Sequence, residues 1–330
     1  MYKPYTILLH YCYTTIADPE EFRTKHHLYC LAHGLRGRII VAQEGINGTV
    51  SGLQEACNEY MRDLKADSRF TNIHFRVASH HQHAFQKLHV RVKQEIVHAS
   101  LPHISPTQRA GQYITSSELQ QVKDEEGVVL LDVRSNYEHR IGKFKNAVTL
   151  DIEHFRDFPA QVGRLAIYKD KKVITYCTGG IRCEKASAYL LERGFKKVYQ
   201  LHGGIIQYGL QTNGEGFEGK CYVFDNRLVT DINQKSHTII GQCYVCHTAC
   251  DRIVNCANAA CNLHVPICEP CAKALDGACS VACQQHPAKR PYEGTGYYTS
   301  KLNGYNPYKG LRSSSKQSHK VVTDNSMSSR

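Results

Sequence analysis

The chain has 330 residues, and 41 Lys and Arg against 30 Asp and Glu give it a formal net charge of +11. This length predicts two or three domains, and a hydrophobic content of 42% excludes a disordered chain. The apolar runs are far shorter than the roughly 20 residues of a membrane helix, and no secretory signal begins the sequence. We therefore expect a cytoplasmic protein, in which the fifteen cysteines serve as metal ligands, as a nucleophile or as core residues rather than as disulfides.

The first elements predict a ferredoxin-like domain over residues 1–98. Residues 5–13 read as a strand, and Asp18 caps a helix that ends near Ala32. The remaining elements are expected as strands over 38–42 and 48–51, a helix over 53–65, and strands over 73–77 and 88–92. The order βαββαβ is that of a split βαβ domain.

The middle of the chain predicts an open α/β domain over residues 115–215. Pro102 and Pro106 mark residues 99–114 as a linker before it. Strands are expected over 128–133, 147–150, 172–176 and 197–200, and helices alternate with them. Residues 216–241 are expected to be a connecting extension.

The most informative segment is the loop after the strand over 172–176. Ligands of open α/β sheets bind beyond the carboxyl ends of the strands, and a helix begins here near Cys183. Loop amides and the helix N-terminus favour a thiolate, so Cys177 is the candidate nucleophile, and Arg182 is expected to place a cation at the rim. The candidate active-site loop comprises Cys177, Thr178, Gly179, Gly180, Ile181 and Arg182.

Cys183 has two interpretations. It lies six residues after Cys177, so it could resolve a modified Cys177 as a disulfide. Alternatively it packs in the first turn of the helix, which is the interpretation we favour.

Nine of the fifteen cysteines lie between Cys243 and Cys283. Paired spacing suits two tetrahedral thiolate zinc sites in a Cys-rich domain over residues 242–286. We favour an interleaved arrangement over a sequential one, and an iron–sulfur cluster is the alternative metal centre. The two expected ligand sets are Cys243, Cys246, Cys268 and Cys271, and Cys256, Cys261, Cys279 and Cys283; Cys250 belongs to neither.

Residues 287–330 read as a basic disordered tail. They carry eight Lys and Arg against two Asp and Glu, with several tyrosines between them. Such a segment could bind a nucleic-acid backbone and stack on bases, or it could be solvated without a partner.

Residues 115–213 resemble the rhodanese family. The resemblance lies in Leu131–Arg134, in Tyr137-Glu138, in the Cys177 loop and in Leu201–Ile205. In that family the loop cysteine forms a persulfide, and the loop here is one residue shorter than the C-x5-R loop of related phosphatases. A phosphatase is therefore disfavoured.

Three further segments are similar to those of the bacterial rhodanese-domain tRNA uridine hydroxylases. They are Glu44–Gly48, Cys177–Glu184 and Gly219–Asp225, and the resemblance extends from about Tyr5 to Cys283. It implies dioxygen-dependent 5-hydroxylation of the wobble uridine, with tRNA bound at its anticodon region and Cys177 as the persulfide. It also implies supporting roles for Asp132 and Arg134.

Two other functions stay open. A sulfurtransferase would move sulfur from thiosulfate or a persulfide donor to tRNA or to a protein. A non-catalytic RNA-binding scaffold is disfavoured by the intact Cys177 and Arg182. No flavin fingerprint and no facial triad of two His and a carboxylate is visible, so no nucleotide cofactor is expected.

Overall fold

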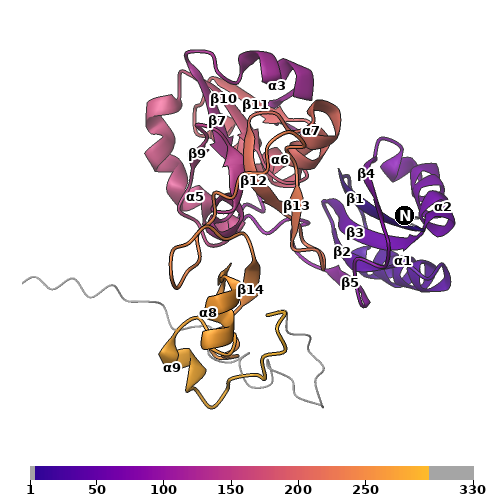
Figure 1. The fold of residues 1–330 in the computed structure, drawn as a ribbon. Helices are drawn as coiled ribbons and strands as arrows, with labels where there is room; N and C mark the ends of the chain where they lie inside the picture. The colour runs from indigo at the N-terminus through magenta and orange to yellow at the C-terminus, as the bar shows by residue number, and fades with distance from the viewer. Residues whose placement is uncertain (1–3, 297–330) are drawn as a thin grey trace, which may run out of the picture. The chain divides into compact units, whose positions relative to one another are not determined.

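The computed structural model describes residues 4–296 and contains two compact units (Figure 1). The first unit spans the chain to Gln242 and includes residues 248–251, and the second comprises residues 243–247 and the chain from Arg252 onward. The tail predicted beyond residue 296 lies outside the described residues. No helix among the described residues has the length and apolar character needed to cross a membrane.

The first unit begins with a five-stranded sheet in the order β4-β1-β3-β2-β5. Its strands are β1 (Tyr5–Tyr13), β2 (Arg36–Ala42), β3 (Gly45–Leu53), β4 (His74–His80) and β5 (Leu88–Val92), and its helices are α1 (Pro19–Ala32), α2 (Gln54–Ala66) and the 3-10 turn η1 (Ser68–Phe70). The predicted βαββαβ order is present in the first four strands, and β5 extends the sheet parallel to β2. The ferredoxin-like class is therefore confirmed, and β5 is the strand expected over 88–92.

The two faces of this sheet have different partners because side chains alternate along each strand. Leu8 and Val50 face the core that α1 and α2 cover. Leu9 pairs with Arg76 across β1 and β4, and Tyr11 pairs with His74. Paired residues share a face, so these four side chains lie together on the face away from the helices.

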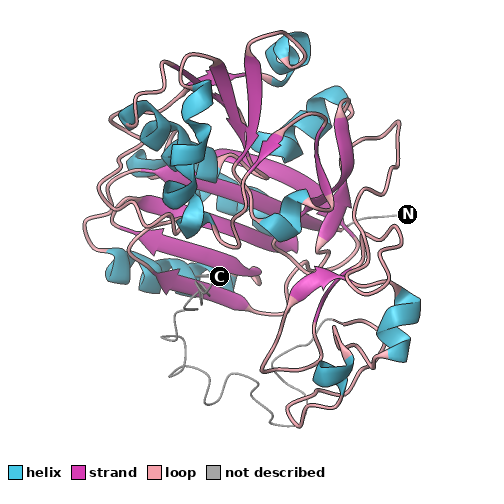
Figure 2. Cartoon of the chain, turned by 90° about the vertical axis from the view of Figure 1, so that its left-hand side faces the viewer, coloured by secondary structure: helices cyan, strands magenta, loops and turns pink. Residues whose placement is uncertain are grey.

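A second sheet has the order β6-β11-β10-β7-β9, with all its paired strands parallel. Its strands are β6 (Gln112–Ile114), β7 (Val128–Asp132), β9 (Val148–Thr149), β10 (Lys172–Tyr176) and β11 (Lys197–Leu201). Its helices are α3 (Ser116–Val122), α4 (Asn136–His139), α5 (Phe158–Gln161), α6 (Ile181–Glu192) and α7 (Gly204–Thr212), with the 3-10 segments η2 (Phe155–Asp157) and η3 (Val162–Tyr168) (Figure 2). Val173 and Ile174 lie in separate hydrophobic clusters, so the sheet is covered on both faces, as the apolar run predicts.

Two segments expected to be connections belong to this core. Leu101 and Ile104, on either side of Pro102, are buried, and the same segment ends in β6. Residues 216–241 form β12 (Phe217–Tyr222) and β13 (Val229–Asp231), which join β8 (Gly142–Phe144) in a small antiparallel sheet. Both segments pack because their apolar residues find partners in the α/β core.

The second unit is small and contains β14 (Ile253–Asn255), β15 (His264–Pro266), α8 (Glu269–Ala274) and α9 (Val281–Gln284). Residues 287–296 also belong to it, which differs from the tail expected from Pro287. The reason is Arg290, which is 6% exposed and donates through Nε to the Ala257 carbonyl at 3.1 Å. This hydrogen bond lets the segment pack instead of extending into solvent.

Candidate active site and metal centres

Cys177 lies in the loop between β10 and α6 and is fully buried. Its Sγ accepts a hydrogen bond from the Gly180 amide at 3.1 Å. Gly180 is the N-cap of α6 and has a φ of +98°, which only glycine adopts readily. The loop therefore folds so that the α6 N-terminus and its amide face the sulfur.

This environment favours the thiolate. Burial by itself raises the pKa of Cys177, but a hydrogen bond from Cys183, the charge of Arg182 and the loop amides lower it to about 5. Burial, together with the neighbouring Cys177, raises the pKa of Cys183, so Cys183 stays a thiol and donates. Cys183 is thus buried in the first turn of α6, where it contacts Cys177.

Arg182 does not place a free cation at the rim. Its Nη1 and Nη2 donate to Glu138 at 2.5 and 2.8 Å, and the side chain of Glu138 is 0% exposed. Phe224 covers the guanidinium at 5.5 Å, and the hydroxyl of Thr178 contacts the same pair. The ion pair ties the Cys177 loop to Glu138 of α4, and the charges of Arg182 and Glu138 neutralise one another.

We expect Arg182→Ala to destabilise the protein rather than only slow it. The substitution leaves Glu138 buried without its counter-charge, which costs about 3–5 kcal/mol of unfolding free energy. Urea denaturation measures this loss. Arg164→Ala, which removes an exposed arginine of η3, is the matched control and should change stability by less than about 0.5 kcal/mol. Equal midpoints for the two variants would contradict the structural role.

Asp132 and Arg134 form a second buried pair away from the sulfur. Arg134 donates to Asp132 through Nε and Nη2 at 2.9 and 2.6 Å, and Nη2 also bonds the Gly142 carbonyl at 2.6 Å. Both side chains are 0% exposed. The pair links the chain after β7 to the Gly142 carbonyl of β8.

The face of the N-terminal sheet that carries Leu9 and Tyr11 lies directly on the Cys177 loop. A Cβ built on Gly179 would lie 2.7 Å from Leu9 Cδ2, and one on Gly180 would lie 3.0 Å from Tyr11 Oη. Tyr11 also donates to Glu184 of α6 at 3.0 Å. The sequence does not indicate these contacts, because a strand pattern does not show which loop its face meets.

Lys185 joins the same helix to the Glu44–Gly48 segment. Its Nζ lies 2.8 Å from Glu44 Oε2 and 3.2 Å from Glu95 Oε1, and the side chain is 0% exposed. Gly45 has a φ of +141°, and a Cβ there would collide with the Cys12 carbonyl. The segment therefore forms a joint between the two domains of the first unit.

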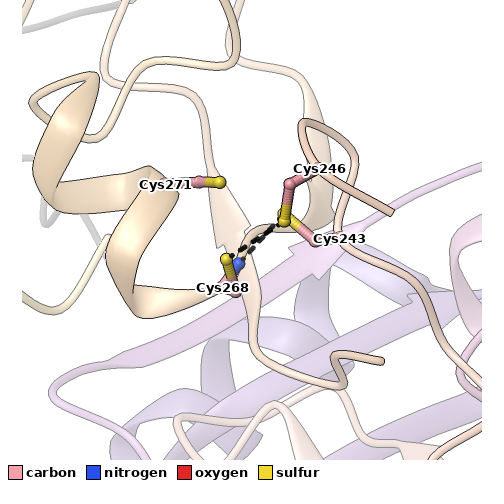
Figure 3. A group of neighbouring side chains, drawn as sticks. All are labelled: Cys243, Cys246, Cys268 and Cys271. Carbon is pink, nitrogen blue, oxygen red and sulfur yellow. Dashed lines mark hydrogen bonds between the residues drawn. The ribbon is translucent and has the colours of Figure 1, made fainter. Parts of the chain in front are cut away.

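The second unit brings together the two sets of four cysteines that interleaved pairing predicts. In each set the four Sγ atoms lie within 4.8 Å of one another. Figure 3 shows the first set, in which Cys246 and Cys268 have Sγ atoms 3.6 Å apart and the Cys268 amide donates to Cys243. Cys250 lies outside both sets.

These distances fit thiolates around a metal. A tetrahedral site with zinc–sulfur bonds of about 2.3 Å has sulfur atoms about 3.8 Å apart. The second set has separations of 3.8 Å for Cys261–Cys279 and 3.7 Å for Cys279–Cys283. A disulfide needs about 2.05 Å, and all fifteen cysteines are free. Both sets are therefore able to hold a metal ion.

Three family models match the chain in turn. The UPF0176 acylphosphatase like domain matches residues 5–96, the rhodanese-like domain matches 115–210, and the model described as rhodanase C-terminal matches 218–284. The second match contains the Cys177 loop, and the third contains both sets of four cysteines.

Curated relatives match over most of the chain. The tRNA uridine(34) hydroxylase of Cytophaga hutchinsonii is 60% identical over 93% of this chain and 98% of its own length. The protein of the same name from Staphylococcus aureus is 45% identical over 87% of this chain and 91% of its own. Among solved structures, the BH2092 protein of Bacillus halodurans is 28% identical over 34% of this chain and 80% of its own, with a TM-score of 0.27. The chain thus belongs to the tRNA uridine(34) hydroxylase family.

Proposed function

We propose that this protein hydroxylates C5 of uridine 34, the wobble position of tRNA, with dioxygen as co-substrate. The observation that carries the proposal is the 60% identity to a tRNA uridine(34) hydroxylase over 98% of that protein. The intact loop around Cys177 supports it. In the overall reaction one oxygen atom is inserted into the C5–H bond to give the hydroxyl group, and the other is reduced to water with two protons and two electrons from an external reductant.

Cys177 is proposed to carry a persulfide. Its thiolate attacks the sulfane sulfur of a donor, forms the S–S bond, and the donor's leaving group departs with the electron pair. The Gly180 amide at 3.1 Å and the α6 N-terminus would stabilise the terminal sulfur anion as they stabilise the thiolate. Zinc is proposed for the two four-cysteine sets, where it would supply folding energy, and a cytoplasmic location follows from a tRNA substrate.

Nucleoside mass spectrometry tests this function. Total tRNA from cells with and without the gene is digested, and we expect loss of 5-hydroxyuridine derivatives without it. The purified protein with tRNA and ¹⁸O₂ should place ¹⁸O in the base. Unchanged 5-hydroxyuridine in the deletion strain would contradict the proposal.

A sulfurtransferase is the second candidate, because the six-residue loop and its thiolate suit sulfur transfer equally well. The same experiment separates the two. Loss of thiolated uridine with 5-hydroxyuridine intact would favour the sulfurtransferase.

We expect removal of residues 297–330 to weaken tRNA binding. The sequence of this segment has six Lys and Arg against one Asp. On a single strand, each phosphate contact adds roughly 0.7 to the slope of log affinity against log salt concentration. Each contact that the truncation removes should therefore reduce that slope by roughly 0.7. The truncation ends at Gly296, because a cut at His286 would also remove Arg290 from its packed position. Titration at two salt concentrations measures both changes, and identical slopes would make this segment irrelevant to binding.

A further inference from the structure

A cavity of about 170 Å³ lies in the first unit where the N-terminal sheet meets the α/β domain. Arg76 of β4 lies in its wall together with His74 of the same strand and His202, which follows β11. We call this space the Arg76 cavity. It adjoins the catalytic loop, because a Cβ on Gly180 would lie 3.7 Å from Arg76 Nη2.

Arg76 is buried but lacks a counter-charge. Its residue is 6% exposed, and no carboxylate of the described chain lies within 4.0 Å of it. Its one hydrogen bond is long, from Nη1 to the His74 carbonyl at 3.4 Å, and the Tyr11 ring lies 5.2 Å from the guanidinium. Most of the five N–H donors of the fork therefore have no protein acceptor.

The other buried cations of the first unit show how unusual this is. Among its described residues, Arg134 pairs with Asp132, Arg182 with Glu138, and Lys185 with two glutamates. A buried charge is costly unless it is paired and hydrogen-bonded. The unpaired donors of Arg76 instead open into the Arg76 cavity, where an anionic ligand can supply the negative charge.

The surroundings of Arg76 favour an anion. Burial lowers the pKa of His202, and the charges of Arg76 and His74 lower it further, so His202 adds no positive charge and Arg76 is the cation that an anion would meet in this cavity. Glu184 also lines the cavity, but its carboxylate accepts from Tyr113 at 2.6 Å and from Gln200 at 3.0 Å in addition to Tyr11. Its oxygens are occupied, which leaves the guanidinium available.

We propose that Arg76 binds a phosphodiester of tRNA next to uridine 34 and thereby positions that base at the Cys177 loop. The inference rests on the proposed function, because it takes tRNA as the substrate. Arginine presents a planar fork that matches two phosphate oxygens, and the burial of Arg76 in the cavity wall strengthens such a contact. Arg76 thus acts as a positioning residue supplied by the N-terminal domain. An inorganic oxyanion such as thiosulfate has similar chemistry, and the experiment separates the two sources.

The first test compares Arg76→Gln and Arg76→Lys with the wild-type protein on an anticodon stem-loop. We expect Arg76→Gln to reduce kcat/KM about 10- to 100-fold, mainly through KM, and Arg76→Lys to fall between. Arg62→Ala is the matched control, because it removes an exposed arginine from α2, on the other face of the same sheet, and should leave kcat/KM unchanged. Wild-type KM in Arg76→Gln would overturn the proposal.

The second test removes the charge from the RNA instead. A methylphosphonate, which is neutral, replaces the phosphate on either side of uridine 34 in turn. One replacement should lower kcat/KM of the wild-type protein as much as Arg76→Gln does, and should have no further effect on that variant. If the replacement lowers kcat/KM by the same factor in the wild-type protein and in Arg76→Gln, the two effects are additive. Arg76 then does not contact that phosphate, and the proposal is wrong. Competition by thiosulfate in wild type but not in Arg76→Gln, with RNA affinity equal in both, would identify the inorganic anion instead.

Stability separates this role from a structural one. Removing an unpaired buried charge should leave the melting temperature of Arg76→Gln equal to or above the wild-type value, whereas a structural arginine would lower it. Wild-type protein that forms no 5-hydroxyuridine would defeat the proposed function. If the wild-type protein is active and Arg76→Gln is equally active, only this inference is wrong.

Discussion

The protein carrying Cys177→Ser should lose hydroxylation activity by at least about 1,000-fold and keep its fold. The surroundings of Cys177 lower its thiol pKa to about 5, so at neutral pH the sulfur is a thiolate. A serine hydroxyl at the same place stays protonated and is a weak nucleophile. Formation of 5-hydroxyuridine in purified tRNA measures the loss, and circular dichroism checks the fold.

The control for this substitution is Cys57→Ser. Burial raises the pKa of the Cys57 thiol to about 11, and Cys57 lies in the N-terminal core, so its replacement should not affect the chemistry. The lowered pKa of Cys177 also predicts how activity depends on pH. Wild-type activity should persist near neutral pH and fall as the pH drops through about 5, where the Cys177 thiolate is protonated. Full activity in Cys177→Ser would remove Cys177 from the mechanism.

Removal of metal should unfold the second unit and leave the first unit folded. We expect two ions for each chain, because two sets of four cysteines lie at ligand distance. Structural zinc contributes about 10–16 kcal/mol of apparent binding free energy in small zinc domains, which becomes folding free energy. Chelation followed by limited proteolysis should therefore cut within residues 252–296 first, and metal analysis should give the stoichiometry.

Single substitutions sharpen this test. Cys268→Ser removes one ligand from the first set and should reduce the metal content toward one ion for each chain. Cys250→Ser is the matched control, because Cys250 lies outside both sets and its loss should leave two ions bound. An iron–sulfur absorbance spectrum of the purified protein would show that the same thiolates hold an iron–sulfur cluster instead of zinc. A metal content of zero in protein with an intact second unit would contradict both.

Local signals predicted the parts of the site that lie close together in the sequence. The strand ending at Tyr176 and the two glycines after Cys177 indicated a thiolate loop, and that loop is present. Paired cysteine spacing likewise indicated the two ligand sets. Both predictions depend on residues a few positions apart or on a repeated spacing, which the sequence displays directly.

Contacts between segments that are distant along the chain could not be predicted from the sequence. Arg182 and Glu138 are 44 positions apart, and nothing in their spacing indicates that they pair rather than face a ligand. Glu138 had a weaker signal, since Ser135 and Glu138 have capping-box spacing at the start of α4. Arg76 had none, because a charged residue in an alternating strand is ordinarily a solvated one.

The ion pairs of Lys185 make the catalytic domain dependent on its neighbour. Lys185 belongs to the helix that carries the Cys177 loop, yet its charge is neutralised by Glu44 and Glu95, which precede residue 99. A chain cut out at residues 115–215 would lose both carboxylates and the Leu101 carbonyl that hold this ammonium. The α/β domain is therefore not an exchangeable module, and any recombination between family members must transfer the Glu44–Gly48 segment and the α6 helix together.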